Sequence, residues 1–445
     1  MNRFCDCESA LLFRSLLGIS VPLLDSIAAA TLNLMNAFLP RMKQTALALA
    51  FALTLAAALS PAAVGAEKAG LPSLLGQWEG VAQEVRGGRK VASPFRIEVT
   101  RQEGPLLWAY DVWHPLDKAT GQPSAQFQRD LMLGSLNPDG TGGVLAKQDA
   151  RFAFRVLEAN RLEVEFVCIR ETEPAAFVMV LHRAGTPAPA DPAKPRVPDL
   201  AGSWHGSYRY PGKNGAIDDA FHIEVVRQDG ECLWADDVWK PLDPATGKPG
   251  TVEKRERLVG GLSFDGKRGV LAKPDVRFAF TVVDANRLDV EFARFGGAAE
   301  APMGFYVTFT RQPGAPAVAR TVALPDLRGN WEGDTHYPQP DGAKPSHLRL
   351  EVTKQDGALL WADNVWRPLD PATRQPGAKV ARDGMAGSLH PDGTAGLLAK
   401  AGARFSFKVL APDRMLVEFV RLRAGLEPPT AFYAVLARQP QAPGR

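Results

Sequence analysis

Tryptophan residues recur in a fixed pattern that could serve binding chemistry. At three places in the chain, two tryptophans lie five residues apart, with an aspartate or asparagine two places before the second. An indole offers a flat apolar surface and an N–H donor, and a carboxylate or amide beside it offers a polar handle for a small molecule. The pattern predicts ligand-binding residues at Trp108, Asp111, Trp113, Trp234, Asp237, Trp239, Trp361, Asn364 and Trp366. In the structural alternative, both indoles pack into a core and the carboxylates cap turns.

Charged residues form a second recurring pattern. An arginine and a glutamate recur fourteen residues apart, at Arg151, Arg277 and Arg404 and at Glu165, Glu291 and Glu418. A catalytic carboxylate is one interpretation, and a cross-strand ion pair on the solvent face is the favoured one. A lysine also recurs, at Lys147, Lys273 and Lys400. It could meet an anionic ligand at a barrel mouth, but the default interpretation is a solvated turn residue.

Motifs of the common enzyme and metal classes are absent from the sequence. The seven histidines do not recur in register, and no Cys/His spacing matches a zinc site. The sequence has no Gly-x-Ser-x-Gly elbow, no phosphate-binding glycine loop and no HExxH motif. We therefore predict no catalytic residue, no metal and no cofactor, and we predict that the protein is not an enzyme.

The composition is that of a globular protein. Of the 445 residues, 45% are hydrophobic and 23% are charged, which is ordinary for packed domains. The net charge of +3 is spread without a basic run, and this argues against nucleic acid as a partner. Four cysteines are too few for a disulfide framework at this length. Cys5 and Cys7 lie at the N-terminus, and Cys168 and Cys232 are expected to be free thiols.

An internal repeat supplies the elements that must position these residues. Trp78, Trp204 and Trp331 are spaced 126 and 127 residues apart, and each precedes its tryptophan pair by the same distance. Units of this length are domain-sized. The predicted domains are residues 71–185, 198–313 and 325–440, joined by Pro/Ala-rich linkers at 186–197 and 314–324.

The N-terminus is predicted to be a targeting segment. Residues 42–66 contain an Ala/Leu-rich run without charge that follows Lys43 and ends in small residues before Glu67, as in a secretory signal peptide. We predict cleavage after Ala66, a periplasmic or secreted location, and no membrane span in the mature chain. An uncleaved membrane anchor is the alternative. Residues 1–41 are interpreted as an upstream segment, either a mis-called start or a membrane-associated segment.

Within each repeat the hydrophobic pattern is that of β-strands. Phe221, Ile223 and Val225 alternate with their neighbours at period two, and clusters of Gly, Pro and Asp separate such runs. About eight sequential strands per repeat predict an all-β fold of three tandem eight-stranded antiparallel up-and-down barrels. β-Sandwiches are the alternative.

The strand geometry divides the tryptophan pairs. Residues five apart fall on opposite faces of a regular strand. One tryptophan of each pair should therefore enter the core. The other should face outward toward a neighbouring barrel, or be turned by a bulge.

Each repeat opens with Gly-x-Trp and closes with an arginine. The tryptophans are Trp78, Trp204 and Trp331, and the arginines are Arg183, Arg311 and Arg438. We expect a structural pair at one barrel mouth, with the guanidinium on the indole plane. This pattern resembles the calycin superfamily of lipocalins and avidins, over most of each repeat in strand number and order. The resemblance implies a barrel that holds a small, often apolar molecule, or one that acts as a protease inhibitor.

Together these observations predict an exported, non-enzymatic binding protein. The expected ligand is a small molecule in each barrel, or a repetitive cell-surface ligand that three linked sites would bind with raised avidity. One alternative is a protein-binding or protease-inhibiting module with filled barrels. The second alternative is a hydrolase that uses the recurring acidic residues.

Overall fold

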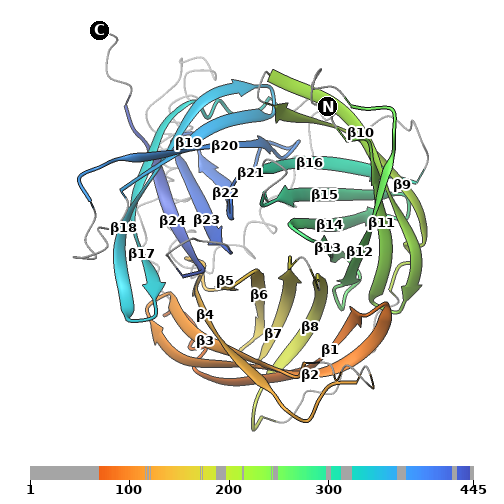
Figure 1. The fold of residues 1–445 in the computed structure, drawn as a ribbon. Helices are drawn as coiled ribbons and strands as arrows, with labels where there is room; N and C mark the ends of the chain where they lie inside the picture. Colours follow the sequence, from red (N-terminus) through yellow and green to blue (C-terminus); the bar gives the residue numbers. More distant parts are fainter. Residues whose placement is uncertain are drawn as a thin grey trace, which may run out of the picture. The chain divides into compact units, whose positions relative to one another are not determined.

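The structure is a computed structural model. It describes residues 70–440 except 116, 118–119, 121, 171, 173, 187–196, 213–214, 242, 244–248, 297–301, 312–322, 368–376 and 423–427. The predicted upstream segment and signal peptide lie outside the described residues, as do most of both linkers, so export and cleavage stay predictions. Residues Leu71–Arg445 form one compact unit, whose strands are labelled in Figure 1.

The first repeat forms barrel 1, a closed barrel of eight antiparallel strands. The strands follow one another around the barrel in chain order, and β8 pairs with β1 to close it. They are β1 (Gly76–Arg86), β2 (Arg89–Glu103), β3 (Leu106–Trp113), β4 (Gln128–Leu136), β5 (Gly142–Lys147), β6 (Ala150–Glu158), β7 (Arg161–Cys168) and β8 (Ala175–Arg183).

The second and third repeats form barrels 2 and 3 with the same topology. Barrel 2 contains β9 (Gly202–Gly212), β10 (Gly215–Asp229), β11 (Cys232–Trp239), β12 (Lys254–Leu262), β13 (Arg268–Lys273), β14 (Val276–Asp284), β15 (Arg287–Arg294) and β16 (Met303–Thr310). Barrel 3 contains β17 (Gly329–Gln339), β18 (Gly342–Asp356), β19 (Leu359–Trp366), β20 (Ala381–Leu389), β21 (Ala395–Lys400), β22 (Ala403–Ala411), β23 (Arg414–Arg421) and β24 (Thr430–Arg438).

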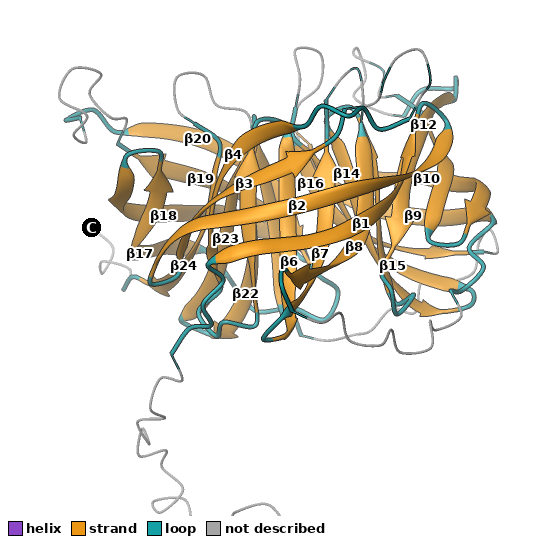
Figure 2. Ribbon diagram, turned by 90° about the horizontal axis from the view of Figure 1, so that it is seen from below, coloured by secondary structure: helices purple, strands orange, loops and turns teal. Residues whose placement is uncertain are grey.

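The predicted fold class is confirmed. All three sheets close on themselves, so the β-sandwich alternative is wrong. Figure 2 shows strands joined by loops throughout the described part of the chain. No helix there is long and apolar enough to cross a membrane. Whether each barrel folds alone stays a prediction.

Period-two alternation builds each barrel core. On β2, Phe95, Ile97 and Val99 are buried at every second position and point into barrel 1. Their equivalents on β10 and β18 do the same in barrels 2 and 3. Since the intervening positions on these strands are more exposed, one sheet face makes the core and the other faces outward.

The opening tryptophan and the closing arginine of each repeat meet at one end of the barrel. Trp78, Trp204 and Trp331 are fully buried, and each indole N–H donates to a carbonyl four residues earlier. The guanidinium carbons of Arg183, Arg311 and Arg438 lie 4.3, 4.5 and 4.8 Å from the centres of these rings.

The motif glycine is required by the backbone. Gly76, Gly202 and Gly329 adopt φ values of 111°, 114° and 117°, a region that side chains disfavour. A Cβ at Gly76 or Gly202 would also contact the stacked arginine, at 3.5 Å. The distance is an ordinary contact, so the positive φ, not the space beside the guanidinium, requires the glycine.

The three barrels pack against one another around a shared apolar cluster (Figure 1). Its buried side chains come from all three repeats, with Val144, Val270 and Leu397 at equivalent positions of β5, β13 and β21. These short strands are buried on both faces. Side chains on one face fill the barrel, and side chains on the other face contact the neighbouring barrels. The sequences of these strands are therefore continuous apolar runs.

Candidate ligand-binding site

The first tryptophan of each predicted pair lies between barrels. We call Trp108, Trp234 and Trp361 the outer tryptophans. The indole N–H of Trp108 donates to Gln339 O at 2.6 Å, that of Trp234 to Gly88 O at 3.1 Å, and that of Trp361 to Gly212 O at 3.3 Å. Each acceptor lies at the first hairpin turn of another barrel. The contacts run cyclically, from barrel 1 to 3, from 3 to 2 and from 2 to 1.

A β-bulge places a cation on each outer tryptophan. The register of β2 against β3 shifts between Val99 and Arg101, and the corresponding strand pairs shift at the same position. The residue after each bulge lies over the indole: Arg101, Arg227 and Lys354, each at 4.4 Å from the ring centre. The outer tryptophans therefore hold barrels together and do not form an open platform.

The second tryptophan of each pair lies at a barrel mouth. We call Trp113, Trp239 and Trp366 the mouth tryptophans; all three are half-buried. A lysine nitrogen lies over each ring, Lys147 at 5.3 Å, Lys273 at 3.8 Å and Lys400 at 5.6 Å. The interpretation of these lysines as solvated turn residues is wrong, because Lys147 and Lys273 are buried and Lys400 is half-buried.

Carboxylates pair with the lysines beneath the mouth tryptophans. Lys147 Nζ lies 2.6 Å from Asp111 Oδ2 and 2.8 Å from Asp130 Oδ2. In barrel 2, Lys273 Nζ lies 2.6 Å from Asp237 Oδ2 and 2.9 Å from a glutamate, Glu256 Oε2. Barrel 3 has Asn364 at the aspartate position, and Lys400 pairs with Asp383 at 2.8 Å. Lys147 and Lys273 thus each bridge two carboxylates.

The electrostatics of barrel 1 are set by burial. Burial raises the pKa of Asp111 to about 6, against the opposing effect of Lys147. Asp130 is also partly buried, but hydrogen bonds from Lys147 and Trp113 outweigh burial and lower its pKa. The Oδ1 atom of Asp111 is buried and has no hydrogen-bond partner among the described residues, and the same holds for Oδ1 of the aligned Asn364 in barrel 3. A buried acceptor of this kind is costly unless a donor reaches it.

A cavity of about 300 Å³ opens at the mouth of barrel 1. Its walls include the rings of Phe95, Phe166, Phe177 and Trp113. Its polar lining includes Asp111, Lys147, Arg86 and Arg170. Apolar walls with a few convergent polar groups are the usual composition of a small-molecule site.

One inward position of the first strand differs in size among the repeats. Ala82 of β1 aligns with Tyr208 of β9 and Thr335 of β17. The Tyr208 ring stacks on Phe305, the equivalent of Phe177, at 4.2 Å. Phe177 lines the barrel 1 cavity, and barrel 1 has the methyl group of Ala82 in place of the phenol. The Ala/Tyr/Thr difference is a sequence signal that no recurring pattern contains.

The recurring arginines and glutamates form a closed ring where the barrels meet. Each arginine bridges a glutamate of its own barrel and one of a neighbour, over N–O distances of 2.6–3.2 Å. In order the ring runs Arg151, Glu165, Arg277, Glu291, Arg404, Glu418 and back to Arg151. The ion pairs do join neighbouring strands, but the expected solvent face is wrong, because all three arginines are buried.

The Arg–Glu ring favours ionised carboxylates. Burial alone would raise the pKa of Glu418, but Arg151 and Arg404 outweigh it and lower the pKa to about 2. The pKa values of Glu165 and Glu291 are lowered for the same reason. A carboxylate held between two arginines is a poor proton donor or acceptor near neutral pH, so the geometry does not favour hydrolysis by these acids.

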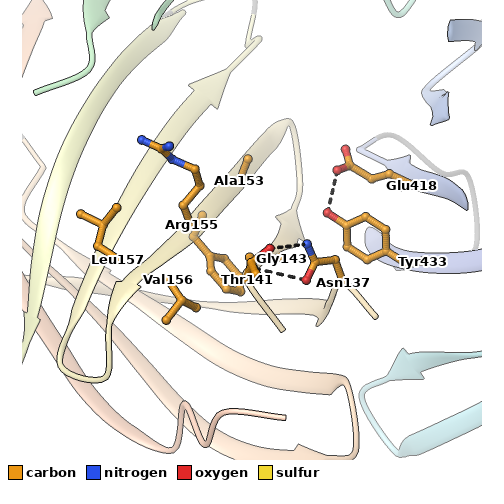
Figure 3. A pocket seen from close by; sticks show the side chains of 11 residues that line it. Asn137, Thr141, Gly143, Ala153, Arg155, Val156, Leu157, Glu418 and Tyr433 are labelled. Atoms are coloured by element: carbon orange, nitrogen blue, oxygen red, sulfur yellow. Dashed lines mark hydrogen bonds between the residues drawn. The ribbon is translucent and has the colours of Figure 1, made fainter. Parts of the chain in front are cut away.

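A groove of about 440 Å³ lies beside the Arg–Glu ring, between barrels 1 and 3 (Figure 3). In barrel 1, Asn137 Nδ2 donates to Thr141 Oγ1 at 3.3 Å, and Asn137 Oδ1 accepts from Gly142 N at 3.2 Å. Across the groove, Tyr433 donates to Glu418 Oε2 at 2.8 Å. Because these polar side chains already engage one another, the groove is a weaker candidate for a ligand than the barrel 1 cavity.

Comparisons with known proteins give only distant likenesses. No family model matches the chain, and no curated protein matches it. A crystal structure of a protein of unknown function from the DUF3598 family of Nostoc punctiforme is similar, with 10% identity over 82% of this chain and 96% of that chain, and a TM-score of 0.22. Isotype 1 transferrin binding protein B from serogroup B Neisseria meningitidis is similar, with 10% identity over 83% and 77%, and a TM-score of 0.18. Similarities this low carry no argument about function.

Proposed function

We propose that this protein is a non-enzymatic binding protein whose barrel 1 holds one small molecule in its mouth. The observation that carries the proposal is the barrel 1 cavity, which is lined by four aromatic rings together with Asp111 and Lys147. The proposal includes an exported location and a calycin-like role, in which the barrel holds a small molecule.

The lining defines the class of ligand. Phe95, Phe166, Phe177 and Trp113 favour an aromatic or aliphatic body. The Oδ1 atom of Asp111 calls for a hydrogen-bond donor on the ligand, such as a hydroxyl or amine.

A second buried group supports a polar ligand substituent. Ser93 lies on the inward face of β2 with Phe95, and its Oγ is buried without a described partner. The aligned residue in barrel 2, Asp219, accepts a hydrogen bond from Tyr208 at 3.0 Å. A ligand in barrel 1 would take the place of that phenol.

The proposal predicts one site per chain. Tyr208 occupies the mouth of barrel 2, and its ring also meets Phe221 edge-on at 5.0 Å. Barrels 2 and 3 then serve mainly to hold barrel 1 through the outer tryptophans and the Arg–Glu ring. Barrel 3 has Thr335 at this position, so the phenol excludes barrel 2 alone, and the proposal assigns the site to barrel 1 because of its cavity.

The test fills the cavity with the residue that barrel 2 already uses. Native mass spectrometry of protein purified from its own host should show one bound small molecule, and titration with 1-anilinonaphthalene-8-sulfonate should give one site. Ala82→Tyr should weaken probe binding about tenfold or more, which is about 1.4 kcal/mol. Tyr208→Ala should add a second site in barrel 2.

The matched control places the same side chain outside the barrel. Val81 precedes Ala82 on β1 and is 55% exposed, so Val81→Tyr should leave probe binding unchanged. Equal binding by the Ala82→Tyr variant would reject barrel 1 as the site. Absence of any bound mass and of probe binding would favour the alternative of a protein-binding module with filled barrels.

A further inference from the structure

Two histidines face each other on the outside of barrel 2. His205 of β9 and His222 of β10 are directly opposite partners in the antiparallel register. Their rings are stacked, with centroids 5.1 Å apart. Neither side chain has a hydrogen bond or an ion pair with a described residue, and both are half-buried. The two imidazoles are therefore adjacent and chemically unengaged.

The other two barrels carry an ion pair at this position. In barrel 1 the aligned residues are Glu79 and Arg96, 3.8 Å apart, and in barrel 3 they are Glu332 and Arg349, 3.2 Å apart. Barrel 2 has replaced both members of the pair with histidine. Exposed ion pairs contribute little to stability, so the stability of the barrel does not depend strongly on which residues occupy this position. The double replacement changes the chemistry of the surface instead.

The surroundings leave room for a ligand above the two rings. On the same outer face of β9, the neighbours of His205 are Ser203 and Ser207, both exposed. On β10, the nearest acid, Glu224, is already paired with Arg255 at 2.5 Å. No group of three metal-binding side chains occurs among the described residues, so an ion here would have two protein ligands.

We propose that His205 and His222 together bind one divalent transition-metal ion, with water completing its coordination. Imidazole is a borderline ligand that suits Cu²⁺, Ni²⁺ and Zn²⁺, and Cu²⁺ should bind most tightly of the three. The sequence-based prediction of no metal rested on the absence of a Cys/His spacing typical of zinc sites, and two histidines on paired strands do not produce such a spacing.

The experiment titrates the full chain, prepared without a histidine tag, with CuCl2, NiCl2 and ZnCl2 by isothermal calorimetry. Electron paramagnetic resonance of the Cu²⁺ complex should show nitrogen coordination. His205→Gln and His222→Gln should each weaken Cu²⁺ binding about tenfold or more, because loss of one ligand removes the effective concentration that the pair provides. Together the two changes should cost little more than either alone.

Two further variants keep the result interpretable. His205→Glu with His222→Arg restores the pair found in barrels 1 and 3, so it should fold and melt normally while losing the ion. His347→Gln removes a histidine of barrel 3 that pairs with Asp334 at 2.8 Å, and it should retain Cu²⁺ affinity. Retained affinity in both single barrel 2 variants, or an equal loss in His347→Gln, would overturn the proposal. Failure of the cavity proposal would not affect this outcome.

Discussion

At the scale of single residues, the closing arginine shows how one side chain joins several backbone segments at the end of a barrel. Arg311 lies over Trp204. Its Nε donates to Ala285 O at 2.8 Å and its Nη1 to Ala201 O at 2.7 Å, and Nη2 reaches Asp199 O. The guanidinium thereby ties the segment before β9 to the β14–β15 turn. Its five N–H groups suit this role better than a lysine would.

Removal of this arginine should destabilise the protein. Arg311→Ala leaves carbonyls without donors, and we expect a loss of about 1–3 kcal/mol in the free energy of unfolding. Denaturant unfolding of Arg311→Ala, Trp204→Leu and the double variant measures the coupling between the two residues. If the losses of the two single variants are additive, the stacking of Arg311 on Trp204 does not contribute to the free energy of unfolding. A loss within about 0.5 kcal/mol for Arg311→Ala would place it with ordinary surface substitutions.

At the scale of elements, the sequence predicted the strands and their inward-facing residues better than the contacts made by their outward faces. Period-two alternation indicated the inward residues of β10, and the glycine-rich turns indicated where strands end. The burial of Arg151 was not predictable in this way, because it depends on the packing of one barrel against another. The burial of Lys147 depends on its pairing with Asp111 and Asp130 of neighbouring strands in its own barrel. The Ala82 cavity was visible only as a difference between repeats, whereas recurrence directed attention to what the repeats share.

The outer tryptophans should control the motion of hairpins in other barrels. Trp234 holds the β1–β2 turn of barrel 1 through Gly88 O. Trp234→Phe removes this hydrogen bond, and the local opening free energy of the turn should fall by about 1 kcal/mol. Hydrogen exchange detected by mass spectrometry should show faster exchange around Gly88.

The control is the mouth tryptophan of the same strand. Trp239→Phe changes an indole at the mouth of barrel 2, and exchange at the β1–β2 turn should stay unchanged. Faster exchange confined to barrel 2 in the Trp234→Phe variant would contradict a role for Trp234 in joining the barrels.

At the scale of the whole molecule, the Arg–Glu ring links stability to pH. The folded-state pKa values of Glu165, Glu291 and Glu418 lie below the ordinary value. The stabilisation is therefore complete above the unfolded-state pKa of about 4.3. It is lost as the pH falls toward about 2, where Glu418 takes up a proton in the folded state.

Thermal unfolding between pH 7 and pH 2.5 tests this linkage. The melting temperature of the native protein should fall steeply below about pH 4.3. Glu418→Gln should lower the melting temperature at pH 7, because Arg151 and Arg404 lose a charged partner, and it should flatten the acid decline. Glu253→Gln, at an exposed position, should change neither. If the melting temperature of the Glu418→Gln variant falls as steeply with pH as that of the native protein, the Arg–Glu ring is not the source of the pH dependence.

The cyclic pattern of contacts has an evolutionary consequence. Each barrel meets both others through equivalent tryptophans and equivalent ion pairs, which is the geometry of a symmetric trimer built from one ancestral subunit. In such a trimer every substitution appears three times, so a hollow mouth or a pair of surface histidines would have to occur in all copies. Fusion of the copies into one chain removes that restriction. The His205–His222 pair is then a change found in one copy while the other two keep the ion pair, and the position of Ala82 has diverged in all three.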